Sequence, residues 1–500
     1  MSRVLPGSRP TAGGPEPATG AMSLFGQMRR LARHSAIYGL GAIVSRFIAV
    51  LLLPLYTRYL TPADYGAVET LLALSAVLVT LLRGGISTAF FRFWFDSPDQ
   101  SHRRVVLRTS FWYTMTAATC GLAAGWIFAD WISDALFGTT DRTWLVRAVF
   151  VALWAQMNFE QLTSVFRVEE RSIAFVTASL VNIAITIGAT VFFVVSLEWG
   201  ATGLVVGNFT GTLCVYAALL FYRREQLGLQ FDWRLYKAME KFGLPLVPSG
   251  LFLWVVNFVD RLLLVKLAST RDVGLYSIGI RLSSAITLLF VAFRTAWPAF
   301  AYSIDDDREA RRTYAYVLTY LLLIACWVAL GLGLLAPWIV RLLTTPKFYD
   351  ASTVVAPLAF GSALFAGYVV VAIGVGRSRR TQFNWVVTGV GAVVNVGLNL
   401  ILIPPYGMMG AAIATVAAYA VMFVGMTWRA QHIYPVPYQW RRVVTLGAVA
   451  VSLVVIGNTL SVPLAGAIAL TAVYPLALLP FGFYLPAERR RLRMLLARAI

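Results

Sequence analysis

Charge, cysteine, histidine and long polar segments are all scarce in this sequence. Charged residues make up 13% of the 500 positions and hydrophobic residues 59%, with a mean hydropathy of +0.72. Soluble domains carry about 25% charged and about 45 to 50% apolar residues, so a soluble globular protein is excluded. The apolar runs continue over about 20 residues and do not alternate over about 10, which excludes a membrane β-barrel and indicates transmembrane helices.

The scarcity of reactive side chains excludes several chemistries. The three cysteines, Cys120, Cys214 and Cys326, lie inside apolar runs, so no disulfide framework is expected. The three histidines form no cluster with metal-ligand spacing, and the sequence has no G-x-x-x-x-G-K-[ST] motif for ATP binding. We therefore predict no metal, no cofactor and no catalytic residues, and interpret the protein as a non-enzyme.

Acidic residues are also few, because 42 Lys and Arg stand against 23 Asp and Glu and leave a net charge of +19. Most basic residues lie between the apolar runs, where they mark cytoplasmic loops and meet anionic lipid head groups. The excess therefore indicates membrane lipids as partners and not nucleic acid.

What the sequence does contain is a series of apolar runs, each long enough to cross about 30 Å of hydrocarbon as a helix. About fourteen spans are predicted, near residues 35–57, 66–91, 105–129, 144–166, 173–197, 201–222, 244–266, 275–301, 314–340, 352–375, 382–403, 408–428, 443–460 and 463–485. The predicted fold class is an all-α polytopic membrane protein.

The basic residues indicate the orientation of these spans. With the N-terminus in the cytoplasm, arginine clusters such as 103–104, 311–312 and 489–491 all fall in inner segments, and the outer loops hold few basic residues. An even number of spans with both termini cytoplasmic is therefore expected. The first 22 residues are rich in Pro, Gly and Ala, which predicts a disordered tail, and translation could start at Met1 or Met22.

Short motifs recur at an offset of 206 to 208 residues. The matched sets are 64–66 with 272–274, 88–90 with 295–297, 171–172 with 377–378, and the Gly200/Gly203 pair with Gly407/Gly410. They predict two six-helix lobes in one orientation, related by a pseudo-two-fold axis along the membrane normal. The expected organisation is a disordered cytoplasmic tail (1–22), an N-terminal lobe (23–222), an interfacial linker helix (223–242), a C-terminal lobe (243–432), and two extra transmembrane helices with a basic cytoplasmic tail (433–500).

Three stretches carry a family resemblance. They are SAIYGLGAIVSRFIAVLLLPLYTRYLTPADYGAVE at 35–69, VDRLLLVKLASTRDVGLYSIGIRL at 259–282, and NVGLNLILIPPYGMMGAAIATVAAYA at 395–420. They resemble the polysaccharide transporter, or O-antigen flippase, branch of the multidrug/oligosaccharidyl-lipid/polysaccharide exporter superfamily, to which lipid II flippases are related. The resemblance implies two lobes around a central cavity and transport of a lipid-linked glycan across the inner membrane by alternating access.

Arginines inside the spans are the candidate substrate-binding residues. They are Arg46, Arg83, Arg261, Arg281 and Arg294. Charge at membrane depth is costly and usually functional, and guanidinium groups bind phosphate oxygens bidentately while staying charged. The arginines would then form a positively charged ladder for a diphosphate head group. The alternative is that each pairs with a carboxylate or caps helix carbonyls.

Three acids within the spans, Asp260, Glu69 and Glu160, are candidates for ion pairing or coupling.

We expect a flippase that moves a lipid-linked, undecaprenyl diphosphate type of oligosaccharide to the outer leaflet for surface polysaccharide biosynthesis. The alternatives are a cation-coupled drug antiporter of the same superfamily, or a membrane glycan polymerase or ligase. A glycan polymerase or glycosyltransferases would be possible protein partners.

Overall fold

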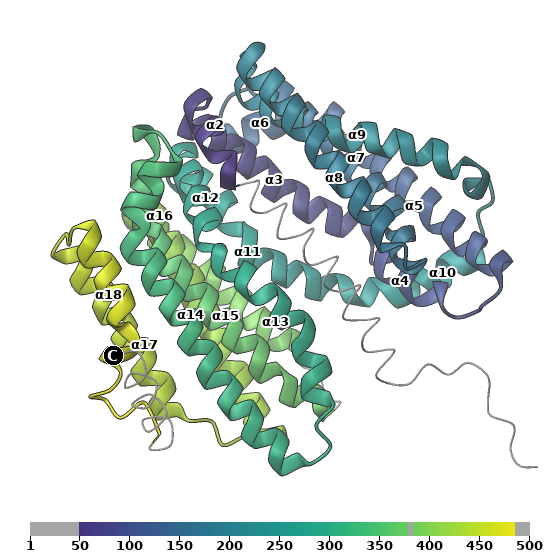
Figure 1. Cartoon of the computed structure of the whole chain (residues 1–500). Helices are drawn as coiled ribbons and strands as arrows, with labels where there is room; N and C mark the ends of the chain where they lie inside the picture. The colour runs from purple at the N-terminus through teal and green to yellow at the C-terminus, as the bar shows by residue number, and fades with distance from the viewer. Residues whose placement is uncertain (1–49, 379–383, 486–500) are drawn as a thin grey trace, which may run out of the picture.

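The helices form two lobes and a flanking pair. The computed structural model describes residues 50–378 and 384–485, and every regular element within them is helical. The predicted tail and Arg46 lie outside the described residues, as does most of the predicted first span. In Figure 1 the helices up to α10 form one lobe, α11 to α16 form the other, and α17 and α18 lie on the flank of the second lobe.

The first lobe runs from α2 to α10. Its elements are α2 Leu53–Tyr59, α3 Pro62–Arg83, α4 Ile86–Trp94, α5 Gln100–Ile127, α6 Ala129–Phe137, α7 Thr143–Val168, α8 Ser172–Val191, η1 Phe192–Ser196, α9 Gly200–Leu227 and α10 Trp233–Gly243. The amphipathic helix α10 packs against α4 and α5 and leads into the second lobe.

The second lobe and the flanking pair complete the chain. Their elements are η2 Leu244–Leu246, α11 Val247–Leu267, α12 Thr270–Ser283, α13 Ala285–Tyr302, α14 Asp307–Leu343, η3 Pro346–Ala351, α15 Ser352–Arg377, α16 Asn384–Ile433, α17 Trp440–Thr459 and α18 Leu464–Ala477. The largest core cluster lies here, between α14, α15, the second half of α16, and the flanking helices.

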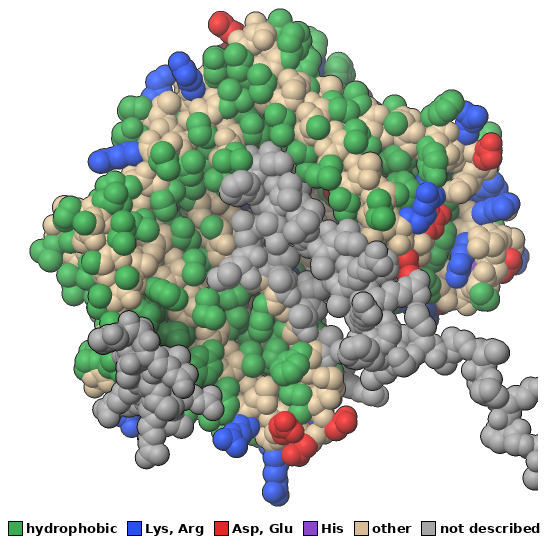
Figure 2. Space-filling model, viewed as in Figure 1, with side chains coloured by type: hydrophobic (Ala, Val, Ile, Leu, Met, Phe, Trp, Pro, Cys, Tyr) green, Lys and Arg blue, Asp and Glu red, His purple; other side chains and the backbone are tan. Residues whose placement is uncertain are grey.

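The surface of the described residues matches a membrane environment. Eight of the helices are long and apolar enough to cross a bilayer, and α18 is a shorter apolar helix. Figure 2 shows hydrophobic side chains over most of the visible face, with charged side chains toward its edges. The predicted all-α, multi-pass, two-lobed class is confirmed, while the number fourteen and the domain boundaries stay predictions.

Several predicted spans are divided or shortened. The span predicted at 66–91 breaks at Gly84 and Gly85, whose φ angles of 52° and 77° place both in the left-handed region. The span predicted at 275–301 divides at Ser284 into α12 and α13. The last predicted span, 463–485, is helical only to Ala477, and the chain beyond it turns through Pro480 and Gly482. Apolar composition continues across these breaks, so hydropathy alone did not reveal them.

The internal repeat appears as matching backbone geometry. Gly200 and Gly407, at an offset of 207 residues, share a φ of 52° at the start of equivalent helical segments. A Cβ on Gly203 would lie 2.9 Å from the Phe193 carbonyl oxygen, and one on Gly410 would lie 2.1 Å from that of Leu402. In each lobe the glycine therefore lets a helix approach the end of the preceding helix.

The helices α3 and α12, which occupy equivalent places in the two lobes, also begin in the same way. Thr61 Oγ1 accepts a hydrogen bond from Asp64 N at 3.1 Å, and Ser269 Oγ accepts one from Asp272 N at 3.0 Å. Each hydroxyl also donates to its aspartate carboxylate, at 2.7 Å in both copies. Such reciprocal caps satisfy the free N–H groups of a helix start. The repeated Asp-x-Gly motif therefore begins α3 in one lobe and α12 in the other.

These two helix starts lie against each other and join the lobes. A Cβ on Gly66 would lie 1.9 Å from the Thr270 carbonyl oxygen, and one on Gly274 would lie 2.0 Å from that of Pro62. Only glycine permits backbones to approach so closely. Nearby, Thr345 Oγ1 donates to the Thr57 carbonyl at 2.8 Å. The lobes are thus in contact at the end of the molecule that the charge pattern predicts to be outer.

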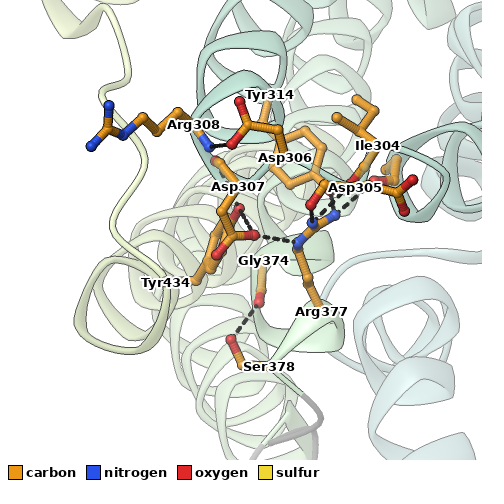
Figure 3. A network of polar contacts seen from close by, with 11 residues as sticks. Ile304, Asp305, Asp306, Asp307, Arg308, Tyr314, Gly374, Arg377, Ser378 and Tyr434 are labelled. Carbon is orange, nitrogen blue, oxygen red and sulfur yellow. Dashed lines mark hydrogen bonds and ion pairs between the residues drawn. The ribbon is translucent and has the colours of Figure 1, made fainter.

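A polar network secures the opposite end of the second lobe, as Figure 3 shows. Arg377 Nε donates to Asp307 Oδ1 at 3.0 Å, and its Nη2 donates to the Ile304 carbonyl at 2.8 Å. Tyr434 Oη donates to the same Asp307 oxygen at 3.1 Å. Burial and the bond to Asp307 raise the pKa of Tyr434, which keeps its hydroxyl protonated. The network ties the ends of α15 and α16 to the start of α14.

Candidate functional site between the two lobes

A carboxylate from one lobe meets two guanidinium groups from the other. Glu69 lies on α3, three residues after Gly66. Its Oε1 accepts a hydrogen bond from Arg281 Nη2 on α12 at 2.8 Å, and its Oε2 lies 3.9 Å from Arg261 Nε on α11. The three side chains are 13%, 27% and 8% exposed. Among the described residues, the ion pairs that join the lobes both involve Glu69.

Arg281 and Arg261 are held by further contacts. The Arg281 guanidinium lies 5.4 Å from the centre of the Tyr65 ring, within the range of a cation–π contact. Arg261 Nη1 donates to the Asn257 carbonyl on its own helix at 3.0 Å. Its buried Nε donates to no acceptor among the described residues. Glu69, at 3.9 Å, is therefore a charge partner of this Nε but not a hydrogen-bond partner.

Two cavities meet at the Glu69–Arg281 pair. The cavity on the side of the first lobe measures about 670 Å³ and is lined by α3, α7, α8 and α9. The cavity on the side of the second lobe measures about 540 Å³ and includes Arg261 and Ser277. Glu69 and Arg281 line both. Volumes of 300 to 1,000 Å³ are typical of small-ligand pockets.

Arg83 and Glu160 form a second pair inside the first lobe. Arg83 Nη2 on α3 lies 2.6 Å from Glu160 Oε2 on α7. Glu160 lines the larger cavity together with Gln156, which donates to its carboxylate. Arg83 is therefore paired with a carboxylate in this structure, as in the alternative to substrate binding that was considered for these arginines.

Asp260 does not pair with the side chain of its neighbour Arg261. Its Oδ1 accepts from the Arg261 backbone N–H at 2.8 Å, and its Oδ2 accepts from the Tyr276 hydroxyl at 2.6 Å. The same hydroxyl lies 3.3 Å from Thr415 Oγ1 on α16. Asp260 is thus buried among neutral donors, in contrast to Glu69 and Glu160.

Two buried asparagines on α16 were not singled out from the sequence. Asn399 Nδ2 donates to Asn395 Oδ1 at 3.1 Å, while Asn399 Oδ1 and Asn395 Nδ2 have no partner among the described residues. Both side chains are fully buried. The sequence signal that could have identified them is their spacing of four residues in an apolar span, because this spacing places two polar amides on one helix face.

The remaining candidate arginines do not join this group. Arg294 on α13 is exposed and makes no ion pair with any side chain that the structure describes. Arg46 lies outside the described residues. The structure therefore brings together Arg261 and Arg281 of the five, with Glu69 as their common acid. The sequence could not indicate that partnership, because Glu69 and Arg281 are 212 residues apart.

Solved structures share the fold of this chain. A lipid II flippase, MurJ, in an inward closed conformation superimposes with a TM-score of 0.72 at 13% identity, covering 90% of this chain and 97% of that chain. An inward-facing multidrug resistance MATE family transporter of the MOP superfamily gives 0.66 at 14% identity, covering 79% and 93%. The chain therefore has the two-lobed, multi-pass membrane fold of these two proteins, which are transporters and not catalytic enzymes.

The particular family follows from the sequence match. The family model described as polysaccharide biosynthesis protein matches residues 55–353, and the chain belongs to this family. The resemblance drawn from the three sequence stretches is confirmed.

Among curated relatives, the lipid III flippase of Escherichia coli is 24% identical over 412 residues, covering 78% of this chain and 95% of that protein. A protein of the Lsg locus of Haemophilus influenzae is 24% identical, covering 55% and 67%. An uncharacterized membrane protein of Methanocaldococcus jannaschii is 23% identical. The chain spans 40% of the length of that archaeal relative.

Proposed function

We propose that the protein is a flippase that moves a lipid-linked oligosaccharide from the cytoplasmic to the outer leaflet of the inner membrane, for cell-surface polysaccharide biosynthesis. The carrier lipid is an undecaprenyl diphosphate type of lipid, and the lobes alternate between inward and outward access. The observation that carries the proposal is the pair of guanidinium groups, Arg261 and Arg281, at the junction of two cavities. The family membership and the lipid III flippase relative support the same substrate class.

A diphosphate suits this junction for a physical reason. Guanidinium groups form short, charge-assisted bonds with phosphate oxygens and remain protonated when water is excluded. Arg261 and Arg281 come from neighbouring helices of one lobe, and the cavity beside them is lined in part by the start of α13, the helix that carries the exposed Arg294. Arg83 and Arg46 complete the proposed set, although Arg83 holds Glu160 in this conformation.

The antiporter alternative is less well supported. A site for a cationic drug needs an acid that is not already neutralised. Glu69 and Glu160, the acids that line the two cavities, each hold an arginine, at 2.8 and 2.6 Å. The similarity to drug transporters extends to the fold alone, at 14% identity.

For the energy source, we propose that Asp260 couples transport to a proton or a monovalent cation. Its carboxylate is the buried acid whose side-chain partner, Tyr276, is neutral. Glu69 and Glu160 serve as pairing acids in this scheme. The basic loops would meet anionic head groups at the cytoplasmic surface. Glycosyltransferases would act before the transport step, and a glycan polymerase would act after it.

The function is tested by Arg261→Ala, Arg281→Ala and Arg294→Ala in cells whose own flippase has been deleted. We expect lipid-linked glycan to accumulate on the inner leaflet in the first two variants. Transport should fall about tenfold or more, because a hydrogen bond to a charged group contributes about 1.5 to 3 kcal/mol. Arg92→Ala, at an exposed arginine paired with Asp96, is the control and should transport normally.

A folding defect is separable from a binding defect. Arg281→Ala leaves Glu69 buried without its partner, whereas Glu69→Gln combined with Arg281→Ala removes both charges. The double variant should recover expression and still fail to transport. Normal surface glycan in all three single-arginine variants would contradict the proposed function.

A further inference from the structure

Glu69 occupies the place that an anionic substrate would need. Its carboxylate contacts both Arg281 and Arg261, at 2.8 and 3.9 Å, and it lines the same two cavities as Arg281. A carboxylate and a phosphate present similar oxygen acceptors to a guanidinium group. In the state that the structure describes, the Arg281 donor is therefore occupied by a group of the protein itself.

The same contact holds the lobes together. Glu69 lies one helical turn from Gly66, and Arg281 lies two turns from Gly274, on the helices that cross at these glycines. Trp254 Nε1 on α11 adds a neutral bond to the Ala73 carbonyl of α3 at 3.0 Å. Separation of α3 from α12 must break the ion pair in a largely buried site, where unpaired charges are costly.

We propose that Glu69 is an exchangeable counter-ion and inter-lobe latch, which the diphosphate of the substrate displaces from Arg281 and Arg261. This inference rests on the proposed function. Displacement leaves both guanidinium groups paired with phosphate oxygens and turns the Glu69 carboxylate toward the larger cavity. The lobes then lose their charged link and are free to separate at the predicted outer end. Without substrate the protein keeps the Glu69–Arg281 link and stays closed at that end, so the lobes open only when substrate is bound.

The local charge fits such an exchange. Glu69 is the acid that forms ion pairs with Arg261 and Arg281, because Asp260 is bonded to Tyr276 and to a backbone N–H within its own lobe. One carboxylate therefore serves two guanidinium groups, and Arg261 Nε stays without an acceptor among the described residues. A diphosphate carries more than one charge and more acceptor oxygens than Glu69, so it can satisfy both arginines.

The test measures separation of the lobes directly. Spin labels are placed at positions 58 and 347, which are exposed and flank the Thr57–Thr345 contact, after Cys120, Cys214 and Cys326 are changed to alanine. The probe ligand is farnesyl diphosphate, added to the full chain in lipid nanodiscs. We expect one short distance without ligand and an additional longer distance with it.

Glu69→Gln should show the longer distance without any ligand. We expect the ratio of closed to open protein to fall by about tenfold, which is within the range typical of coupling between sites. Glu169→Gln is the matched control, because it breaks a partly buried glutamate–arginine pair, with Arg223 at 2.8 Å, inside the first lobe alone. The control should keep the short distance.

Two results would overturn the proposal. A Glu69→Gln protein with the wild-type distance distribution would exclude the latch, and farnesyl diphosphate that binds without lengthening the distance would exclude displacement. Failure of the latch is distinguishable from failure of the flippase function. If the latch fails, Glu69→Gln stays closed while Arg261→Ala and Arg281→Ala still block transport. If the flippase function fails, both arginine variants transport normally, whereas Glu69→Gln still opens and supports the latch.

Discussion

At the scale of single residues, the charged side chains divide by the kind of partner they have. Glu69 and Glu160 hold arginines, whereas Asp260 is held by the Tyr276 hydroxyl and a backbone N–H. A carboxylate with neutral partners can gain a proton or a cation without releasing an arginine into a buried site. The three acids that the sequence grouped together therefore suit two different tasks.

Asp260→Asn should uncouple transport from the ion gradient. The amide oxygen can still accept from the Arg261 backbone N–H, and the amide NH2 can donate to the Tyr276 hydroxyl oxygen, so the fold should be retained while the exchangeable charge is lost. The measurement is glycolipid transport in vesicles with an imposed proton or sodium gradient, where the variant should lose most of the stimulation. Asp350→Asn, at an exposed acid beside Arg271, should behave as wild type. Full stimulation of Asp260→Asn would exclude the assigned role.

The residue types of the site were predictable from the sequence, but their pairing was not. Arg261 and Arg281 stand out because charge inside apolar runs is rare. Glu69 lies near the start of α3, and the sequence predicts it as one of three acids for pairing or coupling without indicating its partner. Its partner is 212 residues away, and that contact depends on how two lobes dock. Periodicity and hydropathy describe one helix at a time and carry no information on such docking.

At the scale of elements, glycine decides where helices break and where they cross. Gly84 and Gly85 end α3 with left-handed backbone angles, inside a run that is largely apolar on both sides. Gly66 and Gly274 permit α3 and α12 to touch along their backbones. The sequence located these helices well, because about 20 apolar residues are a strong signal. It missed their breaks, because a glycine inside a membrane helix is common and has several meanings.

Gly66→Ala should destabilise the crossing of α3 and α12. The new methyl group would lie 1.9 Å from a backbone oxygen of Thr270, which cannot move aside as a side chain could. We expect a loss of about 1 to 3 kcal/mol in the free energy of unfolding, the usual cost of overpacking. Gly397→Ala on α16 is the control, because its methyl group would meet nothing within 4 Å.

Thermal unfolding in detergent would compare the two variants. Gly397→Ala should match or exceed the wild-type melting temperature, since alanine is the better helix former. Equal melting temperatures for Gly66→Ala and Gly397→Ala would mean that the close approach of the two helices does not contribute to stability.

At the scale of the whole molecule, duplication and charge asymmetry together define the architecture. The repeat offset of 206 to 208 residues predicted two equivalent lobes, and the matched φ angles at Gly200 and Gly407 agree with it. The bias of arginine toward alternate loops predicts which end faces the cytoplasm. Orientation is a property of the protein in its membrane, so it needs a measurement on cells.

Cysteine labelling would test the orientation. In a background without Cys120, Cys214 and Cys326, Lys347→Cys should react with a membrane-impermeant maleimide on intact cells. Arg308→Cys, at an exposed position at the start of α14, should react only after the membrane is permeabilised. The protein with no cysteine serves as the blank. The opposite labelling pattern would invert the predicted topology.

The glycine contact between the lobes has the symmetry of an isologous dimer interface. Gly66 fits against the Thr270 carbonyl and Gly274 N, while Gly274 fits against the Pro62 carbonyl and Gly66 N. In such an interface each partner offers the surface that it also accepts. In this contact, a single lobe therefore carries a surface that is complementary to its own copy. The covalent chain fixes as one molecule an association that an unduplicated ancestor could have formed as a homodimer.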